Sequence, residues 1–291
     1  MFQSVAKNLS FTKASQELFV SQPAITKHIQ ELEAAYQTRL FDRQGSRISL
    51  TDSGKLLLEH CERILEDYKR LEYEMHLLHN EYTGGLKLGA STTIAQYVLP
   101  PLLASFIGKF PQVNLSLLNG NSREIEAALQ EHRIDLGFVE GVFRLPNIKY
   151  TTFLEDELVA VVRTGSRLTV GEEITPEELL HLPLVLRERG SGTLDVFERA
   201  LQQHNIKLSS LQVLMYLGST ESIKLFLEHT DCLGIVSIRS IIRELYSGQL
   251  RVVEIKGMPM LRDFSFAQPQ GQESGLAQVF MQFAMHNNNK L

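Results

Sequence analysis

A long helical stretch with one repeating apolar stripe constrains this chain more than any other feature of its sequence. Across residues 52–80, apolar residues recur at alternating spacings of four and three, while charged residues crowd the other faces. The stripe consists of Leu57, Cys61, Ile64, Tyr68, Leu71, Met75 and Leu78. Such a heptad seam is typical of helices that pair with another helix. Because one helix cannot bury this stripe alone, the pattern predicts a partner helix.

Before this stretch, the sequence predicts two short helices joined by a tight turn. The first covers Thr12–Leu18, and Ser21 is a good N-cap for the second, which carries Pro23 in its first turn. Its apolar stripe consists of Ile25, Ile29, Leu32 and Tyr36. The opposite face is polar, and two such helices indicate a helix-turn-helix that binds DNA.

A short hairpin is predicted for residues 41–50, with Gly45 in the turn and Arg43 and Arg47 on either side of it. Beside a DNA-binding helix these two cations suit phosphate or minor-groove contacts, although elsewhere they would be ordinary surface residues. Residues 1–60 carry seven basic and six acidic side chains, against 22 and 28 in the rest of the chain. A nucleic-acid surface would therefore be a local patch rather than a basic domain.

After a linker at residues 82–85, the pattern changes to alternating strands and helices. Strands are predicted at 86–90, 113–118, 134–139, 157–162, 183–186, 213–217, 232–237 and 251–255. Helices are predicted near 94–110, 122–131, 193–204, 220–229 and 238–246. This alternation indicates an α/β fold with largely parallel sheets.

Four loops in this region follow strands and open helices with small polar residues: 91–93, 119–122, 189–193 and 218–220. Ligands of open α/β sheets bind beyond the carboxyl ends of the strands, where helix N-termini offer unpaired N–H groups to anions. Two such N-termini facing one cleft would hold a small anion without a full cationic partner. The alternative is that these residues only cap their helices.

The sequence contains no recognisable catalytic or metal-binding motif, including GxSxG, HExxH and the phosphate loop. His76 and His79 could share a metal ion, but a solvated helix face explains them better. Cys61 and Cys232 lie far apart, which fits a reducing compartment, and Cys232 is expected to be a buried structural thiol. Without a leader or a long apolar run, the chain is expected to be a cytoplasmic protein with no membrane partner.

Residues 9–54 read LSFTKASQELFVSQPAITKHIQELEAAYQTRLFDRQGSRISLTDSG. This stretch resembles the amino-terminal signature of LysR-type transcriptional regulators, with SFTKAS, SQPAITKHI, RLFDR and LTDSG in the family's order and spacing. More loosely, LGAS, FPQVNLSL, DLGFVEG and LGIVS resemble the regulatory half of the family. Within it, LGASTTIAQYVLPPLL, GNSREIEAALQ and IDLGFVEG look closest to the branch linked to sulfur and cysteine metabolism.

The resemblance implies an N-terminal all-α winged helix-turn-helix with a long linker helix, followed by a two-lobed α/β domain like that of periplasmic binding proteins. The expected bounds are 1–54 for the DNA-binding domain, 55–85 for the dimerisation helix and hinge, and 86–291 for the effector-binding domain. Lobe I would comprise residues 86–161 and 268–291, and lobe II residues 162–267. Family members usually carry further residues before the position of Phe2, so the chain is expected to begin inside its first helix, through either a truncation or a wrongly assigned initiator.

Carried over to this chain, the resemblance implies a set of site residues. Those that would face DNA are Ser21, Gln22, Pro23, Thr26, Lys27 and Gln30, with Arg43 and Arg47 on the wing. Those that match effector-contacting positions are Ser91, Thr93, Asn121 and Thr193, with Glu140 and Gly141 lining the same cleft, and the loops add Thr92, Ser191 and Ser219.

The leading hypothesis is a bacterial DNA-binding transcriptional regulator that responds to a small, anionic metabolite and needs no cofactor. Its partners would be promoter double-stranded DNA, the effector, further copies of itself in a homodimer or homotetramer, and RNA polymerase. A second hypothesis is a cytosolic solute-binding module without DNA activity, and a third is an enzyme on the α/β domain. The SQPAITKHI helix argues against the second, and the missing catalytic motifs argue against the third.

Overall fold

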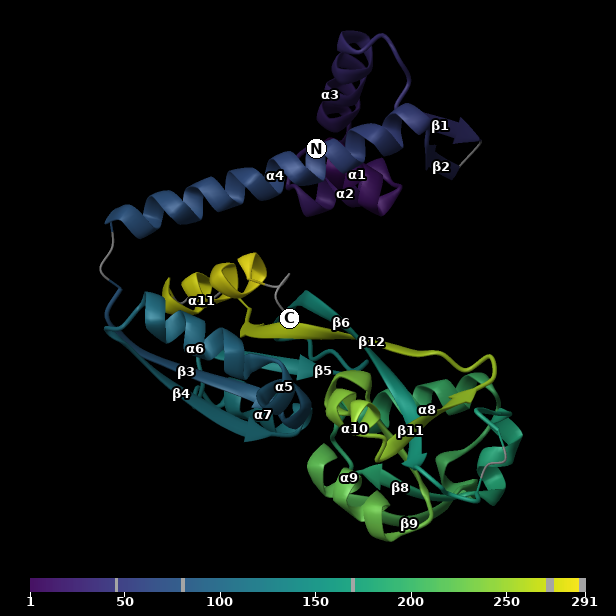
Figure 1. The fold of residues 1–291 in the computed structure, drawn as a ribbon. Helices are drawn as coiled ribbons and strands as arrows, with labels where there is room; N and C mark the ends of the chain where they lie inside the picture. The colour runs from purple at the N-terminus through teal and green to yellow at the C-terminus, as the bar shows by residue number, and fades with distance from the viewer. Residues whose placement is uncertain (45–46, 80–81, 169–170, 271–274, 288–291) are drawn as a thin grey trace. The chain divides into compact units, whose positions relative to one another are not determined.

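The computed structural model describes residues 1–44, 47–79, 82–168, 171–270 and 275–287, which form two compact units, Met1–Asn80 and Glu81–Leu291 (Figure 1). Gly45, expected in the hairpin turn, lies outside the described residues. So do the side chains of Arg43, Arg47, Met75, His76, Leu78 and His79. In the described part of the chain, no helix is both long enough and apolar enough to cross a bilayer.

The first unit is a small helical domain with a two-stranded hairpin. Its elements are α1 (Phe2–Asn8), α2 (Phe11–Glu17), α3 (Gln22–Ala35), β1 (Phe41–Gln44), β2 (Arg47–Leu50) and α4 (Asp52–His79). Phe41 lies in the core, where its ring centroid is 5.5 Å from that of Phe2 and 5.9 Å from that of Phe11. The expected helix-turn-helix is confirmed. Tyr36, predicted on the apolar stripe, is instead 59% exposed because α3 ends one residue before it.

The start of α4 is fixed by two local interactions. Thr51 caps the helix by accepting a hydrogen bond from Gly54 N (3.0 Å), and it donates one to Arg39 O (2.7 Å). Gly54 has no room for a side chain, since a Cβ there would overlap the Leu40 carbonyl oxygen. Thr51 and Gly54 of the LTDSG sequence therefore both have a structural role where the hairpin passes into α4.

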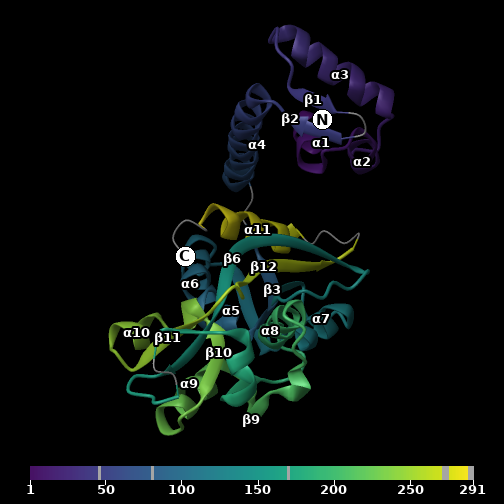
Figure 2. The same cartoon turned by 90° about the vertical axis from the view of Figure 1, so that its right-hand side faces the viewer.

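The second unit is built on one large mixed sheet. Its strands are β3 (Gly84–Ser91), β4 (Val113–Gly120), β5 (Leu136–Glu140), β6 (Ile148–Arg163), β7 (Glu173–Ile174), β8 (Pro183–Arg187), β9 (Gln212–Leu217), β10 (Leu233–Ser237), β11 (Leu250–Ile255) and β12 (Met260–Pro269). The main strand order is β4-β3-β5-β12-β6-β10-β8-β9, and β11 joins β6 to β7. Figure 2 shows the second unit turned by 90°, with β3, β6, β9, β10, β11 and β12 labelled.

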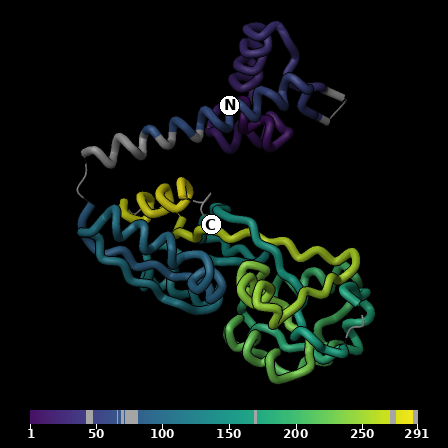
Figure 3. The backbone as a smooth tube through the Cα atoms, viewed as in Figure 1, coloured from purple at the N-terminus to yellow at the C-terminus, as the bar shows by residue number. Residues whose placement is uncertain are grey.

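Helices cover this sheet on both lobes. They are α5 (Thr92–Tyr97), α6 (Leu99–Lys109), α7 (Ser122–Gln130), α8 (Gly192–Gln203), α9 (Thr220–His229), α10 (Ile242–Tyr246) and α11 (Gly275–His286). Short 3-10 helices occupy Pro176–His181, Leu208–Ser210 and Ile238–Ser240. In Figure 3 the chain can be followed from the blue lobe I through the green lobe II and back to the yellow α11 on lobe I.

The two long strands β6 and β12 belong to both lobes. Residues 158–161 of β6 pair with β10 in lobe II, whereas residues 264–267 of β12 pair with β5 in lobe I. The lobe bounds expected near 161 and 268 therefore fall inside shared strands. The strands were expected to be largely parallel, which holds for the outer parts of the sheet but not for its centre, where β6 pairs antiparallel with β10, β11 and β12.

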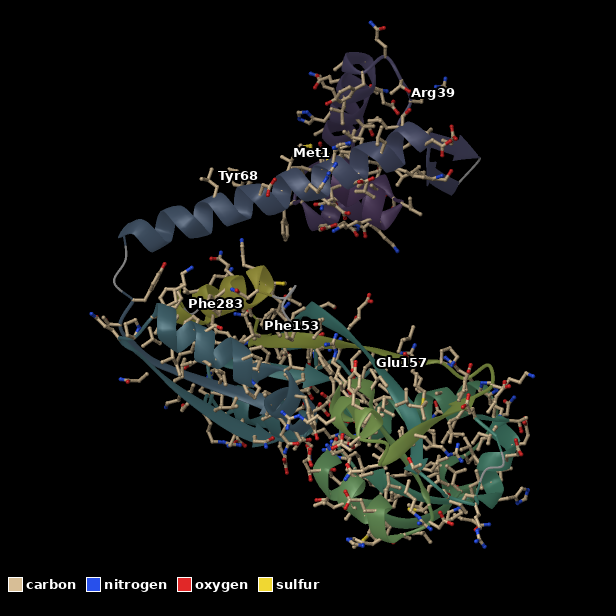
Figure 4. The ribbon with its side chains drawn as sticks, in the orientation of Figure 1. Met1, Arg39, Tyr68, Phe153, Glu157 and Phe283 are labelled. Atoms are coloured by element: carbon tan, nitrogen blue, oxygen red, sulfur yellow. The ribbon has the colours of Figure 1, made fainter. Side chains whose placement is uncertain are left out.

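Lobe I has an aromatic core. Phe106 of α6 is fully buried, and its ring centroid lies 4.6 Å from Phe110, 4.8 Å from Phe280 and 5.2 Å from Phe283. Phe283 is labelled on α11 in Figure 4. Helix α11 thus completes a core that begins at α6, far earlier in the chain.

We expect Phe106→Ala to lower the free energy of unfolding of this domain by about 3–5 kcal/mol, because it removes a buried aromatic ring and leaves a cavity. Its neighbour Ile107 is 50% exposed, so Ile107→Ala is the matched control and should change stability by roughly 0.5 kcal/mol or less. Urea unfolding followed by circular dichroism measures both, since the chain has no tryptophan. Equal effects in the two variants would contradict this account of the core.

Candidate functional site

Helix α3 presents one polar face above a buried apolar one. Ile25 and Ile29 are buried in the core of the first unit, whereas Lys27 and Gln30 are exposed. The residues expected to face DNA are placed accordingly: Ser21, Gln22, Pro23, Lys27 and Gln30 are exposed, and Thr26 is partly so. This face therefore has the polar side chains and the access that contact with DNA needs.

The position of α3 relative to the hairpin is set by a half-buried acceptor, Glu33. Glu33 Oε1 accepts hydrogen bonds from Leu40 N (2.8 Å) and Phe41 N (3.3 Å), which ties the end of α3 to the first strand of the hairpin. On the exposed side, Lys27 Nζ lies 3.8 Å from Glu31 Oε1. Since both side chains of that pair are more than half exposed, the ion pair leaves Lys27 available to a phosphate or a base.

The four polar loops of the second unit lie at the carboxyl ends of β3, β4, β8 and β9. Three of them cap helices, as the alternative interpretation expects: Asn121 accepts from Glu124 N (3.0 Å), Ser191 from Leu194 N (3.2 Å) and Ser219 from Ser222 N (3.1 Å). The lobes touch here, because Arg123 N donates to Gly190 O at 3.3 Å. Gly192 packs so closely on Glu140 that a Cβ would overlap the carbonyl oxygen of Glu140.

The other predicted residues meet in a network around Glu140. Ser91 Oγ donates to Glu140 Oε2 (2.5 Å), and Thr93 Oγ1 donates to Glu140 Oε1 (3.1 Å). Arg262 Nη1 lies 3.2 Å from Glu140 Oε1 and donates to Thr193 Oγ1 at 3.0 Å. The two lobes are therefore joined through one arginine of β12.

The same arginine also binds a second carboxylate. Arg262 Nε and Nη2 both lie 2.7 Å from Asp156 Oδ2, and Ser237 Oγ donates to Asp156 Oδ1 at 2.7 Å. The side chains of Glu140, Asp156 and Arg262 are at most 1% exposed. We call Glu140, Arg262 and Asp156, with the four hydroxyls that bind them, the buried ion network.

The network changes what Ser91 and Thr93 can do. Their hydroxyl protons are committed to a carboxylate, so they are not free to donate to an anionic ligand. Thr92 differs, since its Oγ1 is buried and has no hydrogen-bond partner among the described residues. Gly141 adopts a positive φ of 118° and opens the loop after β5. An anion in this cleft therefore needs donors beyond Ser91 and Thr93.

A second polar cluster crosses the lobes nearby. Tyr97 of α5 donates a hydrogen bond to Glu221 of α9. Lys224 Nζ binds Glu221 Oε1 (2.8 Å) and Glu244 Oε1 (2.7 Å), and it lies 5.3 Å from the centre of the Tyr97 ring. Burial raises the pKa of Glu221, but hydrogen bonds from Lys224 and Tyr97 outweigh it and the net shift is downward. Glu221 is thus held as a carboxylate between the lobes.

Arg187, at the end of β8, is a third buried cation of this region besides Arg262 and Lys224, with 1% of its surface exposed. Its Nε and Nη2 donate to the carboxylate of Glu188 at 2.8 and 3.1 Å. Its Nη1 has no hydrogen-bond partner in the described part of the chain. From the sequence we expected helix N-termini to hold an anion without a cationic side chain. The structure places a cationic side chain, Arg187, close to these helix N-termini.

A cavity of about 400 Å³ lies beside the shared strands. Its lining comprises Gly141, Val142, Arg144, Glu155, Asp156, Arg199, Leu261, Arg262 and Asp263. Three arginines face three carboxylates there, so the cavity has no clear excess of either charge. Of the effector residues predicted from the sequence, this lining contains Gly141.

Cys232 is buried at the start of β10, and burial raises the pKa of its thiol to about 11. The thiol therefore stays protonated near neutral pH, which fits the expected structural role. Among the described residues, no three histidine, cysteine or acidic side chains are grouped so as to hold a metal ion.

Thr93 and Thr92 provide a matched test of the network. We expect Thr93→Val to lower the free energy of unfolding by about 1.5–3 kcal/mol, because it removes a hydrogen bond to a buried carboxylate. Thr92→Val should be neutral or stabilising, since it removes a buried hydroxyl without a partner among the described residues. Urea unfolding of both variants measures the difference, and equal stabilities would show that the Thr93 hydroxyl does not support Glu140.

Two family descriptions match nearly the whole chain. Residues 1–55 match the bacterial regulatory helix-turn-helix protein of the lysR family, and residues 79–288 match the LysR substrate binding domain. A relative from Escherichia coli K12, the uncharacterized HTH-type transcriptional regulator YeiE, is 34% identical over 255 residues, which cover 88% of this chain and 84% of that protein. The HTH-type transcriptional regulator CysL of Bacillus subtilis is 29% identical, covering 91% of this chain and 88% of that protein.

The second unit also resembles a solved structure. The Synechocystis CcmR regulatory domain in complex with 2-PG is 27% identical and superposes with a TM-score of 0.65, covering 72% of this chain and all but 1% of that domain. Both halves of the chain, and their order, match one group of proteins. The chain therefore belongs to the LysR family of bacterial transcriptional regulators.

Proposed function

We propose that this protein is a DNA-binding transcriptional regulator whose second unit binds a small anionic metabolite and which has no enzymatic role. The observation that carries the proposal is the exposed polar face of α3 above buried Ile25 and Ile29, in a region that matches the helix-turn-helix of the family. A solute-binding module without DNA activity would have no use for such a face. The names of its relatives, which are transcriptional regulators, support this choice.

Lys27→Ala should weaken binding to a DNA fragment selected by the purified protein by about 1–3 kcal/mol if Lys27 contacts a base. If it contacts a phosphate, the salt dependence of binding should become shallower instead. Lys7→Ala removes the same charge from α1, where Lys7 Nζ lies 3.3 Å from Glu62 Oε1, and should have little effect. Gel-shift titrations at several salt concentrations measure both variants. Wild-type affinity and salt dependence in the Lys27 variant would remove α3 from the recognition role.

Self-association is part of the proposal, and the surface of α4 supports it. Leu57 and Cys61, at the start of the heptad seam, pack on the core of the first unit. Further along, Ile64, Tyr68 and Leu71 are 64%, 57% and 55% exposed. Figure 4 labels Tyr68 on the surface of the helix. Large apolar residues at heptad spacing on an exposed helix fit a second copy of the same helix.

The edges of the sheet in the second unit add a second apolar surface. Leu117 and Leu118 on β4 are each 38% exposed, and on β9 the exposed fractions are 53% for Leu214 and 48% for Met215. These two strands end the main strand order on opposite sides. Exposed edge strands with apolar side chains favour pairing with another chain. A homo-oligomer held by α4 and by these edges is consistent with both surfaces.

Leu71→Asp should produce a smaller assembly, because a charge buried without a partner at a helix interface costs several kcal/mol. Leu56→Asp is the matched control: Leu56 is 59% exposed on the same helix but does not lie on the heptad seam. Light scattering of the two purified variants gives their masses. If Leu71→Asp keeps the mass of the wild-type protein, the seam does not hold the oligomer together.

The effector class rests on the chemistry at the lobe contact. Helices α8 and α9 begin directly after the loops that follow β8 and β9. Arg187, at the end of β8, has one N–H group that finds no acceptor among the described residues. Helix N-termini and a buried guanidinium favour an anion over a neutral ligand. The CcmR regulatory domain, which has this fold, was solved in complex with a small ligand, 2-PG. We therefore expect a small anion as effector, bound between the lobes.

A further inference from the structure

Arg187 is a buried cation with an incomplete set of partners. The fork of its guanidinium binds Glu188 through Nε and Nη2, and Nη2 also donates to Gly218 O at 3.4 Å. Nη1 is buried and finds no acceptor among the described residues. A buried donor on a charged group without an acceptor is costly and rare in folded proteins. Arg187 Nη1 can therefore accept one further partner, and an oxygen atom of a ligand would supply it.

The surroundings of Arg187 place it at the contact between the lobes. It ends β8, and its acceptor Gly218 directly precedes Ser219, the N-cap of α9. Burial raises the pKa of Tyr97 in lobe I, and the charge of Arg187 in lobe II acts on the same hydroxyl in the opposite direction. The guanidinium thus lies within electrostatic reach of both lobes.

We propose that Arg187 anchors the effector by its oxyanion group, in competition with Glu188. This inference rests on the proposed function, since it identifies the cation of the same anion site. A guanidinium binds carboxylate, sulfate and phosphate groups through two parallel hydrogen bonds, the arrangement that Glu188 now has. The Glu188 side chain is 26% exposed, so it can turn into solvent when an anion arrives. Without a ligand, the Glu188 carboxylate therefore occupies the place on Arg187 that the oxyanion group of the effector would take.

This exchange would take place at the base of a loop that joins the lobes. Glu188 O accepts hydrogen bonds from Ser191 Oγ (2.9 Å) and Ser191 N (3.2 Å), which hold the turn before α8. Within that turn, Gly190 O accepts from Arg123 N of lobe I at 3.3 Å. A movement of Glu188 would therefore alter the hydrogen bond between Arg123 and Gly190, which joins the lobes. A regulator needs such a ligand-driven change in conformation.

The cavity beside β6 and β12 is the competing location. Arg144 and Arg199 in its lining are exposed and form no ion pair among the described side chains, and the carboxylates of Glu155, Asp156 and Asp263 line the same space. An exposed cation among three carboxylates attracts an anion less strongly than a buried guanidinium with an unused N–H. Arg187 is therefore favoured, and Arg199 is the natural control.

The experiment compares four variants of the full-length protein with the wild type. Calorimetric titrations use sodium sulfate, sodium phosphate and sodium acetate as probes, with ionic strength matched by sodium chloride. Arg187→Gln should weaken binding of whichever probe gives heat by about tenfold or more, because a charge-assisted pair is lost. Glu188→Gln should strengthen it several-fold, because it removes the competing charge and keeps an acceptor for Arg187. Arg189→Gln removes an exposed neighbouring cation, and it should bind like the wild type, as should Arg199→Gln.

Thermal melts with and without sulfate distinguish a change in anion binding from a folding defect. Without added anion, Glu188→Gln should melt at a lower temperature than the wild type, since it leaves Arg187 buried without a counter-charge. Sulfate should then raise its melting temperature more than that of the wild type, because a tighter ligand stabilises the folded state more. Non-specific effects of sulfate appear equally in Arg189→Gln and are subtracted.

Two results would overturn the inference. If Arg187→Gln binds the probes as the wild type does, or if Arg199→Gln loses binding instead, Arg187 is not the anchor and the anion site of the proposed function lies elsewhere. If no probe binds to any variant, including Glu188→Gln, the anionic effector class is wrong as well. Neither result bears on DNA binding, which the Lys27 titrations measure separately.

Discussion

Arg262 is held between the carboxylates of Glu140 and Asp156 at a place that water does not reach, since all three side chains are at most 1% exposed. Breaking such a pair leaves a charge in the protein interior and costs about 3–5 kcal/mol. Because Glu140 ends β5 in lobe I, and Thr193 on the same arginine opens α8 in lobe II, the pairing fixes how the lobes meet. The close packing of Gly192 on Glu140 and the hydrogen bond from Arg123 N to Gly190 O lie at the same contact between the lobes.

Much of this organisation could be predicted from the sequence. The helix-turn-helix, the hairpin and the long helix follow from capping residues and apolar spacing, which are local properties. In the second unit each predicted strand corresponds to an observed one, although β6 is much longer than expected, since it begins at Ile148 rather than Glu157. Within each lobe the predicted loops lie at the carboxyl ends of parallel strands, and the loops of the two lobes meet where Arg123 N donates to Gly190 O.

What the sequence could not show was the partner of each polar side chain. Arg262 lies on β12, which was not predicted, because Arg262 and Asp263 interrupt its apolar run. The alternation of Met260, Arg262, Phe264 and Phe266 on one face is the signal that could have revealed this strand. Arg187 directly precedes a charged, glycine-containing turn and has the appearance of a surface residue. Its partners Glu188 and Gly218 come from the turns after β8 and β9, a pairing that no local pattern encodes.

An anion bound between the lobes is expected to change the affinity of α3 for DNA. The most direct measurement is a fluorescence anisotropy titration of labelled, protein-selected DNA, carried out with and without the anion that gives calorimetric heat. We expect a shift in DNA affinity of about 5–150-fold, with an equal reciprocal shift in anion affinity when DNA is bound. An anion that binds between the lobes and leaves both DNA affinity and its own affinity unchanged would contradict it.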